Sequence, residues 1–448
     1  DAPEINEQDR ASNRRLLSAY KDIYDQLFSP VIEQDASLRE KLTYLLNTQK
    51  TILDDCCIIL IKSDDRMEAY KLFAILNDRG KALAEGDLLR LYTLELLDKA
   101  EGDFGQHLDR IQRAWDMILW HEDNEIEGFL RAYFPSQLGK RAPSRDLPDS
   151  YLKEFFYSQS DEIGMPEANQ VRDRVENMQV ESKLYHLIVA GRWPYGEDPQ
   201  INWQRDRLRR LIVHLKIIIC IPLLLSACRH LSEKQFGELV YMLEKFAFRY
   251  ITIVGAHASP FGSICNKHAK KIRDEKDNYS LQEVRDDLSK LLQERASDSL
   301  FSAGIEENLN YEITSRRIII RYFLTTLEDY YKSYASNRDN DNPLVPDRIR
   351  VFDLEQTTIE HIYPQNPTEE NVDEELEDLK NTIGNLTILV PEDNRELGND
   401  PFEQKKTEYE RSSLFMNQEL GAQANWKKAN LLSRRDILVD IAKRVFRL

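Results

Sequence analysis

A glutamate and a histidine stand side by side at positions 360 and 361, within the sequence TIEHIYPQNP, and two asparagines follow at 385 and 394. Hydrolysis of a phosphodiester needs a base that deprotonates water and a hard cation held by oxygen ligands. His361 suits the first task, because an ordinary histidine pKa of about 6.5 allows it to accept a proton at neutral pH. Glu360 and the side-chain oxygen of Asn394 suit the second. The four polar side chains therefore predict one cleft with hydrolytic chemistry.

The same pair has a structural interpretation. A histidine after a glutamate at a strand end is often a solvated or hydrogen-bonded structural residue, and so short a motif is only a hypothesis. Adjacent residues of a strand also point to opposite faces, so Glu360 and His361 share a site only if the strand bends or ends between them. Pro364 favours an early strand end.

The elements that must position these residues follow from local patterns. Residues Thr357 to Ile362 predict a short strand, and NLTILV, from 385 to 390, predicts a second strand. Asp400 as N-cap, Pro401 at the first helical position and Glu403 at the third predict a helix that begins near Pro401. The predicted order is strand, strand and helix, a small ββα unit.

Upstream of this unit the chain reads as helical. Residues 101 to 335 predict a helical scaffold, as in SEKQFGELVYMLEKFA, where Ser232 and Gln235 form a capping box. Pro- and Gly-rich segments at 134–150 and 193–200 predict exposed loops. The apolar stretch from Leu211 to Cys228 predicts a buried helix that is kinked near Pro222, too short in its apolar part to span a bilayer.

Composition limits the class of protein. The 448 residues allow two to four domains. A break at NRDNDNPLVPD, from 337 to 347, and a change of character near 100 predict domains at 1–100, 101–336 and 337–448.

The five cysteines have neither zinc-finger nor disulfide-framework spacing, and no export signal is present, so a cytoplasmic protein without membrane contact is expected. The net charge of −17 requires local basic patches or a metal for any contact with nucleic acid.

The segments IEHIYPQ and IGNLTILVPEDNRELGNDPFEQKKTEYERS resemble the HNH nuclease domain of GmrSD-type modification-dependent restriction enzymes, over roughly residues 310 to 448. They are also similar to the HNH domain of the RNA-guided CRISPR nuclease. The resemblance implies that His361 is the general base, that Glu360 and Asn394 bind Mg²⁺ or Mn²⁺, and that Asn385 braces the loop that bears His361. Glu360 departs from the more usual aspartate, which would alter the metal geometry slightly.

A second segment, AYKLFAILNDRGKALAEGDLLR, from 69 to 90, resembles the GmrS-like, ParB-related domain that binds and hydrolyses a nucleotide. The resemblance implies nucleotide contacts at Asn77, Arg79 and Gly80, and GTP or another NTP as a cofactor of the full-length protein. Their local pattern by itself favours a helix C-cap, with Gly80 at positive φ. The Asp-Gly-Gln-Gln-Arg motif of that family does not occur in this sequence, so we expect that the N-terminal part of the domain is missing or divergent.

Two lysines are the best sequence candidates for contact with DNA. The region from 405 to 448 carries a local positive charge, and Lys405 and Lys406 lie closest to the predicted site. Any single lysine there is also typical of a solvated helix face. The acidic run between the two predicted strands, from 368 to 380, is expected to point away from phosphates.

Together these features predict a mainly α fold, in which a helical scaffold joins a remnant of an α+β ParB-like domain to a C-terminal HNH (ββα-metal) domain embedded in helices. The predicted function is a metal-dependent DNA endonuclease of phage defence that acts on modified phage or foreign DNA, as a homo-oligomer or with partner defence subunits. The alternatives are a non-catalytic helical interaction protein and a nucleotide-sensing regulatory subunit.

Overall fold

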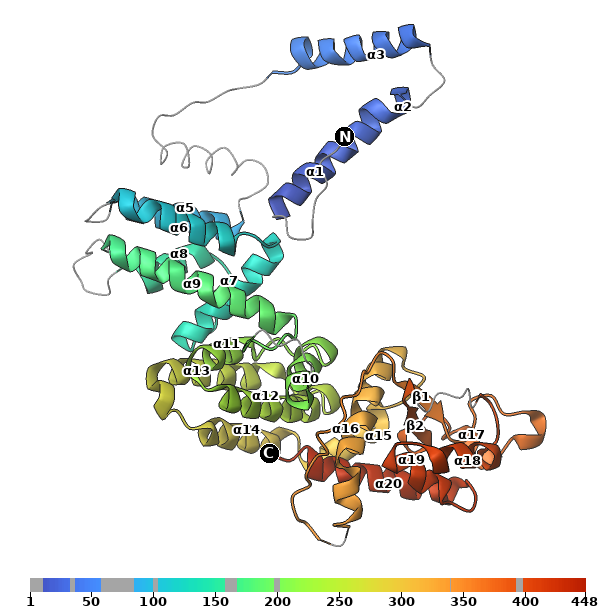
Figure 1. The fold of residues 1–448 in the computed structure, drawn as a ribbon. Helices are drawn as coiled ribbons and strands as arrows, with labels where there is room; N and C mark the ends of the chain where they lie inside the picture. Colours follow the sequence, from blue (N-terminus) through green and yellow to red (C-terminus); the bar gives the residue numbers. More distant parts are fainter. Residues whose placement is uncertain are drawn as a thin grey trace. The chain divides into compact units, whose positions relative to one another are not determined.

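The computed structural model describes residues 11–32, 37–57, 84–99, 104–157, 167–196, 202–338, 340–391 and 398–448. It is mainly helical, as the sequence predicts, and its described residues contain a two-stranded sheet (Figure 1). The chain divides into two compact units. The first unit comprises residues 1–133 and 142–183, and the second comprises 134–141 and 184–448. The functional division at 100/101 and 336/337 stays a prediction.

The first unit is built from helices. Its elements, of which α7 and α9 continue into residues of the second unit, are α1 (Ala11–Ile23), η1 (Tyr24–Phe28), α2 (Ser29–Ile32), α3 (Leu38–Lys50), η2 (Thr51–Asp55), α5 (Glu85–Lys99), α6 (Phe104–Ile118), α7 (Asp123–Leu138), α8 (Leu147–Tyr151), η3 (Leu152–Phe156) and α9 (Ala168–Val189). Helix α5 packs against α6 and α8. The buried indole of Trp115 donates a hydrogen bond to Thr93 Oγ1 at 2.8 Å, which fixes α6 on α5.

The predicted loop at 134–150 is only partly correct. Helix α7 extends to Leu138 and contains Pro135, and Phe134 and Ser136 are buried. Burial of the Phe134 ring stabilises this last turn against the helix-breaking effect of the proline. The irregular segment therefore begins at Gly139, where φ is +70°.

The second unit begins with a helical layer. Its elements before the sheet are α10 (Trp203–Arg209), η4 (Arg210–His214), α11 (Ile221–His230), α12 (Glu233–Ala247), η5 (Phe248–Ile253), α13 (Ala258–Glu275), η6 (Lys276–Asn278), α14 (Leu281–Arg295), α15 (Asp298–Asn308), η7 (Thr314–Arg316) and α16 (Arg317–Ala335). The predicted capping box of Ser232 and Gln235 is confirmed at the start of α12.

The apolar stretch from 211 to 228 is mostly buried, with Val213 and Ile218 exposed, and it is not one kinked helix. It starts inside η4, leaves helical geometry before Lys216, whose φ is +57°, and re-enters a helix at Ile221. Pro222 lies in the first turn of α11, where its missing N–H costs no intrahelical hydrogen bond. The proline thus begins a helix and does not kink one. Among the described residues, none of the helices has the length and apolar character needed to cross a membrane.

The ββα unit is confirmed in its order. Strands β1 (Thr358–His361) and β2 (Leu386–Leu389) pair antiparallel, with Glu360 opposite Thr387 and His361 opposite Leu386. The remaining elements are η8 (Glu369–Asn371), α17 (Glu374–Glu377), η9 (Ile383–Asn385), α18 (Phe402–Arg411), α19 (Phe415–Gly421) and α20 (Lys428–Val445). The N-cap of α18 is Pro401, one residue later than predicted.

Helix α16 belongs to the packing of this C-terminal region. It contacts both strands as well as α19 and α20, although it lies before the predicted boundary at 336/337 (Figure 1). A separate apolar cluster lies under the sheet and α18, and includes Ile362, Leu376, Phe402, Tyr409 and Trp426. The two short strands are therefore held between α16 and the C-terminal helices.

Candidate active site

Glu360 lies on β1 with its side chain toward α18. Its Oε1 is 2.5 Å from the ammonium nitrogen of Lys405, and the Glu360 side chain is only 15% exposed. Burial raises the pKa of the Glu360 carboxyl, and the nearby charge and hydrogen bond of Lys405 act in the opposite direction. The site thus contains a largely buried carboxylate oxygen that is already neutralised by one cation.

His361 ends the same strand and is buried among different neighbours. Its Nε2 lies 3.0 Å from Oδ1 of Asn381, and the Tyr311 ring meets the imidazole edge to face, with 4.6 Å between ring centroids. Burial lowers the pKa of His361, and the positive charges of Lys405, Lys380 and Arg317 lower it further. The hydrogen bond to the Asn381 oxygen acts in the opposite direction. The neutral imidazole is favoured, which is the form that can accept a proton.

The strand ends after His361 and not between Glu360 and His361. The two side chains therefore leave β1 on opposite faces, one toward α18 and the other toward Asn381 and Tyr311. Lys405 connects them indirectly, because its ammonium group also donates to the backbone oxygen of His361 at 2.8 Å.

Asn385 is completely buried where the chain enters β2. Its Oδ1 accepts from the backbone N–H of Tyr363 at 2.8 Å and from the Trp426 indole at 3.0 Å. Its Nδ2 donates to the backbone oxygens of Tyr363 and Lys380 at 2.9 and 2.8 Å. One side chain therefore ties the loop that follows His361 to the entrance of the second strand and to the segment before α20.

Several predicted site residues cannot be placed. Asn394, the predicted second metal ligand, lies outside the described residues, as do Asn77, Arg79 and Gly80. Glu360, His361 and Asn385 lie at the ends of the two strands, with the side chains of Glu360 and His361 on opposite faces of β1, and the metal and nucleotide roles of all these residues stay predictions.

Lys405 does not have the exposure expected of a residue that contacts DNA. Its side chain is 0% exposed, and its charge is used inside the protein by Glu360 and the His361 carbonyl. The reason is helical spacing: Phe402, Lys405 and Tyr409 are the buried residues of α18. Lys406 is half-buried and stays a candidate for contact with DNA.

Sequence reasoning also missed two neighbours of His361. Asn381 follows an acidic run and Tyr311 lies 50 residues upstream, so neither has a local pattern that connects it to the strand. Lys405 could have been found, since its spacing from Phe402 places it in the apolar stripe of α18.

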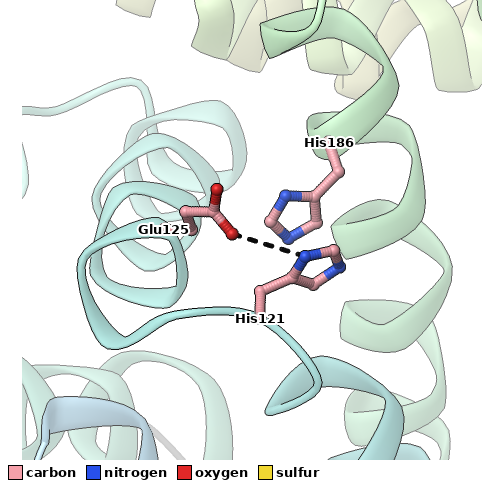
Figure 2. Close-up of side chains that lie close together, drawn as sticks. All are labelled: His121, Glu125 and His186. Atoms are coloured by element: carbon pink, nitrogen blue, oxygen red, sulfur yellow. Dashed lines mark ion pairs between the residues drawn. The ribbon is translucent and has the colours of Figure 1, made fainter. Parts of the chain in front are cut away.

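Another histidine–carboxylate pair lies in the first unit. His121 Nδ1 is 3.4 Å from Glu125 Oε2, four residues later at the start of α7 (Figure 2). His186, also drawn in Figure 2, belongs to the second unit. The side chains of the pair are 34% and 50% exposed, as is typical of a surface ion pair.

The fold and the site together define a ββα unit with an acid–histidine pair at the tip of its first strand, enclosed by helices. Residues 296–441 match the family model described as "GmrSD restriction endonucleases, C-terminal domain". The match covers about a third of the chain and begins upstream of α16, in agreement with the packing of that helix against the strands. It indicates a nuclease domain of the restriction class. The comparison with curated proteins gave no match.

Proposed function

We propose that the C-terminal region of this chain is a metal-dependent DNA endonuclease of the HNH type, which acts in modification-dependent restriction and phage defence. The observation that supports this most is the position of His361, a buried histidine at the tip of β1 whose following loop is braced by Asn385. This geometry agrees with the roles implied by the resemblance of the sequence, and the family match to residues 296–441 supports the same class.

In the proposed reaction His361 takes a proton from the water that attacks phosphorus. Burial supports this role, because it keeps the imidazole neutral and ready to accept the proton. Asn385 fixes the backbone on both sides of the loop and so limits the freedom of the base.

The residues present fit a divalent cation in part. Glu360 supplies a carboxylate, the ligand type that Mg²⁺ and Mn²⁺ prefer, and Lys405 engages only its Oε1. Asn394 would supply the second protein oxygen. A cation bound there would neutralise charge on the phosphate and the leaving oxygen.

A plasmid nicking assay with Mg²⁺ or Mn²⁺ tests the proposal. Wild type, His361→Ala and Asn394→Ala are compared on unmodified and modified DNA. His361→Ala is expected to lose activity by at least about 100-fold, since a general base contributes 10²–10⁴-fold, and Asn394→Ala is expected to lose activity because it removes a metal ligand. Lys290→Ala, an exposed lysine of α14 outside the basic region 405–448, is the control. Equal behaviour of wild type and both site variants would remove the nuclease function.

The ion pair of Glu360 with Lys405 favours one alternative, a non-catalytic interaction protein that has kept the fold. In that case Lys405 replaces the cation permanently, and wild type neither cuts DNA nor binds Mn²⁺. Calorimetric titration with Mn²⁺ separates the two functions, because the nuclease is expected to bind the ion and Glu360→Gln to bind it more weakly.

A further inference from the structure

A short segment between α15 and α16 lies against the loop that precedes β2. The backbone N–H of Tyr311 donates to the backbone oxygen of Asn381 at 3.0 Å, and Asn310 forms an isolated antiparallel bridge with Thr382. Residues 310–312 are thus attached to residues 381–382 by backbone pairing. They lie before residue 337, where the nuclease domain was predicted to start, but at the beginning of the stretch from about 310 to 448 that resembles the HNH domain.

The same segment determines which way the Asn381 amide faces. Nδ2 of Asn381 donates to Oε1 of Glu312 at 2.8 Å. Because the carboxylate oxygen accepts this hydrogen bond, the amide nitrogen faces Glu312 and the amide oxygen faces the other way. That oxygen is the atom that lies 3.0 Å from His361 Nε2.

The orientation of the Asn381 amide determines which nitrogen of the His361 imidazole carries the hydrogen. Because the Asn381 oxygen cannot donate, Nε2 of His361 must carry the hydrogen in this bond. In a neutral ring the other nitrogen, Nδ1, is then unprotonated. The hydrogen bond at Nε2 is the one that the ring makes to a described side chain, so Nδ1 keeps its lone pair for a proton from outside.

We propose that Asn381, oriented by Glu312, is a positioning residue that holds His361 in the Nε2–H tautomer and leaves Nδ1 as the atom that accepts the proton. The inference rests on the proposed nuclease function for its purpose, but not for its geometry. Tyr311 assists by packing edge to face on the ring, and its own ring is covered by the Arg317 guanidinium, 4.1 Å from the centroid.

Nuclear magnetic resonance of the full chain with ¹⁵N-labelled histidine rings tests the tautomer directly, without metal or DNA. The His361 signals are assigned by their loss in His361→Gln. In wild type we expect a pyrrole-type Nε2 and a pyridine-type Nδ1. An Nδ1–H pattern in wild type would overturn the inference, whatever the variants do.

Variants of Asn381 test the cause. Asn381→Leu and Asn381→Ala remove the acceptor and are expected to give mixed tautomers, whereas Asn381→Gln keeps both the acceptor oxygen and a donor for Glu312 and is expected to retain the wild-type pattern. Asn371→Leu, an exposed asparagine in η8, is the matched control and is expected to change nothing. An unchanged pattern in both Asn381→Leu and Asn381→Ala would overturn the assignment.

Kinetics separate this inference from the proposed function. On a DNA substrate, Asn381→Leu is expected to lower kcat by about 10–100-fold with little change in KM, as is usual for residues that orient a functional histidine, and Asn381→Gln is expected to restore most of the rate. If the tautomer depends on Asn381 but no variant or wild type cuts DNA, the positioning stands and the nuclease function fails. If His361→Ala abolishes cutting while Asn381→Leu keeps both the tautomer and the rate, the nuclease function stands and the positioning role of Asn381 fails.

Discussion

At the scale of single residues, the buried charge of Lys405 is the feature with the clearest energetic consequence. Its ammonium group is 0% exposed and 2.5 Å from the largely buried carboxylate of Glu360. Lys405→Met keeps the length of the side chain but leaves that carboxylate unpaired. We expect a loss of about 2–4 kcal/mol in the free energy of unfolding at pH 7, measured by urea denaturation.

The neighbouring lysine provides the control. Lys406→Met also removes one positive charge from α18, but at a half-buried position. It should alter the free energy of unfolding by less than about 0.5 kcal/mol. Equal effects of the two substitutions would mean that the pair of Lys405 with Glu360 contributes no net stability.

The residues of the site differ in how far the sequence reveals them. Glu360, His361 and Asn385 could be predicted, because they lie in motifs with a fixed spacing and adjoin short strands that the β-branched residues indicate. The burial of Lys405 could not be predicted from its charge. It depends on the position of this residue on the face of α18 that packs into the protein. Asn381 and Glu312 are brought to His361 by pairing between segments about 70 residues apart, and this has no local signal.

At the scale of elements, a group of buried charges joins α10, η4, α12 and α16. Arg207 lies 3.2 Å from Asp206 and 3.5 Å from Glu244, and Arg210 lies 2.6 Å from Asp206. Asp329 adds a third carboxylate, which accepts from the Trp203 indole at 3.0 Å. Two cations thus face three acids.

Removal of a cation from this group should be far more costly than removal of an acid. Arg207→Met is expected to destabilise the protein by about 3–5 kcal/mol, because it leaves buried carboxylates unpaired. Asp329→Asn keeps an acceptor for the indole and removes the surplus negative charge, so we expect a cost below about 1 kcal/mol. Denaturant titrations at pH 7 measure the free energy of unfolding of both variants. A larger loss of stability in Asp329→Asn than in Arg207→Met would contradict this account.

Glu328, also on α16, caps the start of α19. Its carboxylate accepts from the backbone N–H groups of Phe415 and Met416 at 2.6 and 3.0 Å, and α19 has no side-chain cap of its own. Burial raises the pKa of Glu328 to about 7, although these two hydrogen bonds lower it. The folded protein thus binds this proton more tightly than the unfolded chain, whose glutamate pKa is near 4.5.

The sign of the pH dependence follows from that difference. The contribution of Glu328 to stability is largest below pH 4.5 and is lost as the pH rises through 7, by up to about 3 kcal/mol. Glu328→Gln cannot ionise, so wild type should lose stability relative to this variant between pH 5 and pH 8. Urea denaturation at several pH values measures the difference, with Glu403→Gln, an exposed glutamate of α18, as control. A constant difference would show that Glu328 does not titrate in this range.

At the scale of the whole second unit, the nuclease-like sheet depends on helices that come before it. Glu328, Tyr311 and Phe248 all lie upstream of residue 337. The ring of Phe248 stacks on the ring of Phe446 near the C-terminus, with 4.4 Å between the ring centroids. A chain that starts at 337 would expose the apolar surfaces that α16 covers on both strands, α19 and α20. The break at 337–347 lies within the second compact unit of the chain, and the functional boundary at 336/337 stays a prediction.

Two fragments distinguish this arrangement from an independent ββα domain. Residues 184–448 keep α16, η5 and the segment at 310–312, so we expect cooperative thermal unfolding followed by circular dichroism. Residues 337–448 lose the covering helix, the cap of α19 and the Phe248–Phe446 contact, and a region of that size has little other core to replace them. We expect this shorter fragment to show no cooperative transition and to bind a hydrophobic dye. A cooperative transition in residues 337–448 would mean that the sheet and its C-terminal helices hold their fold alone, and that α16 serves only to position His361 through the segment that precedes it.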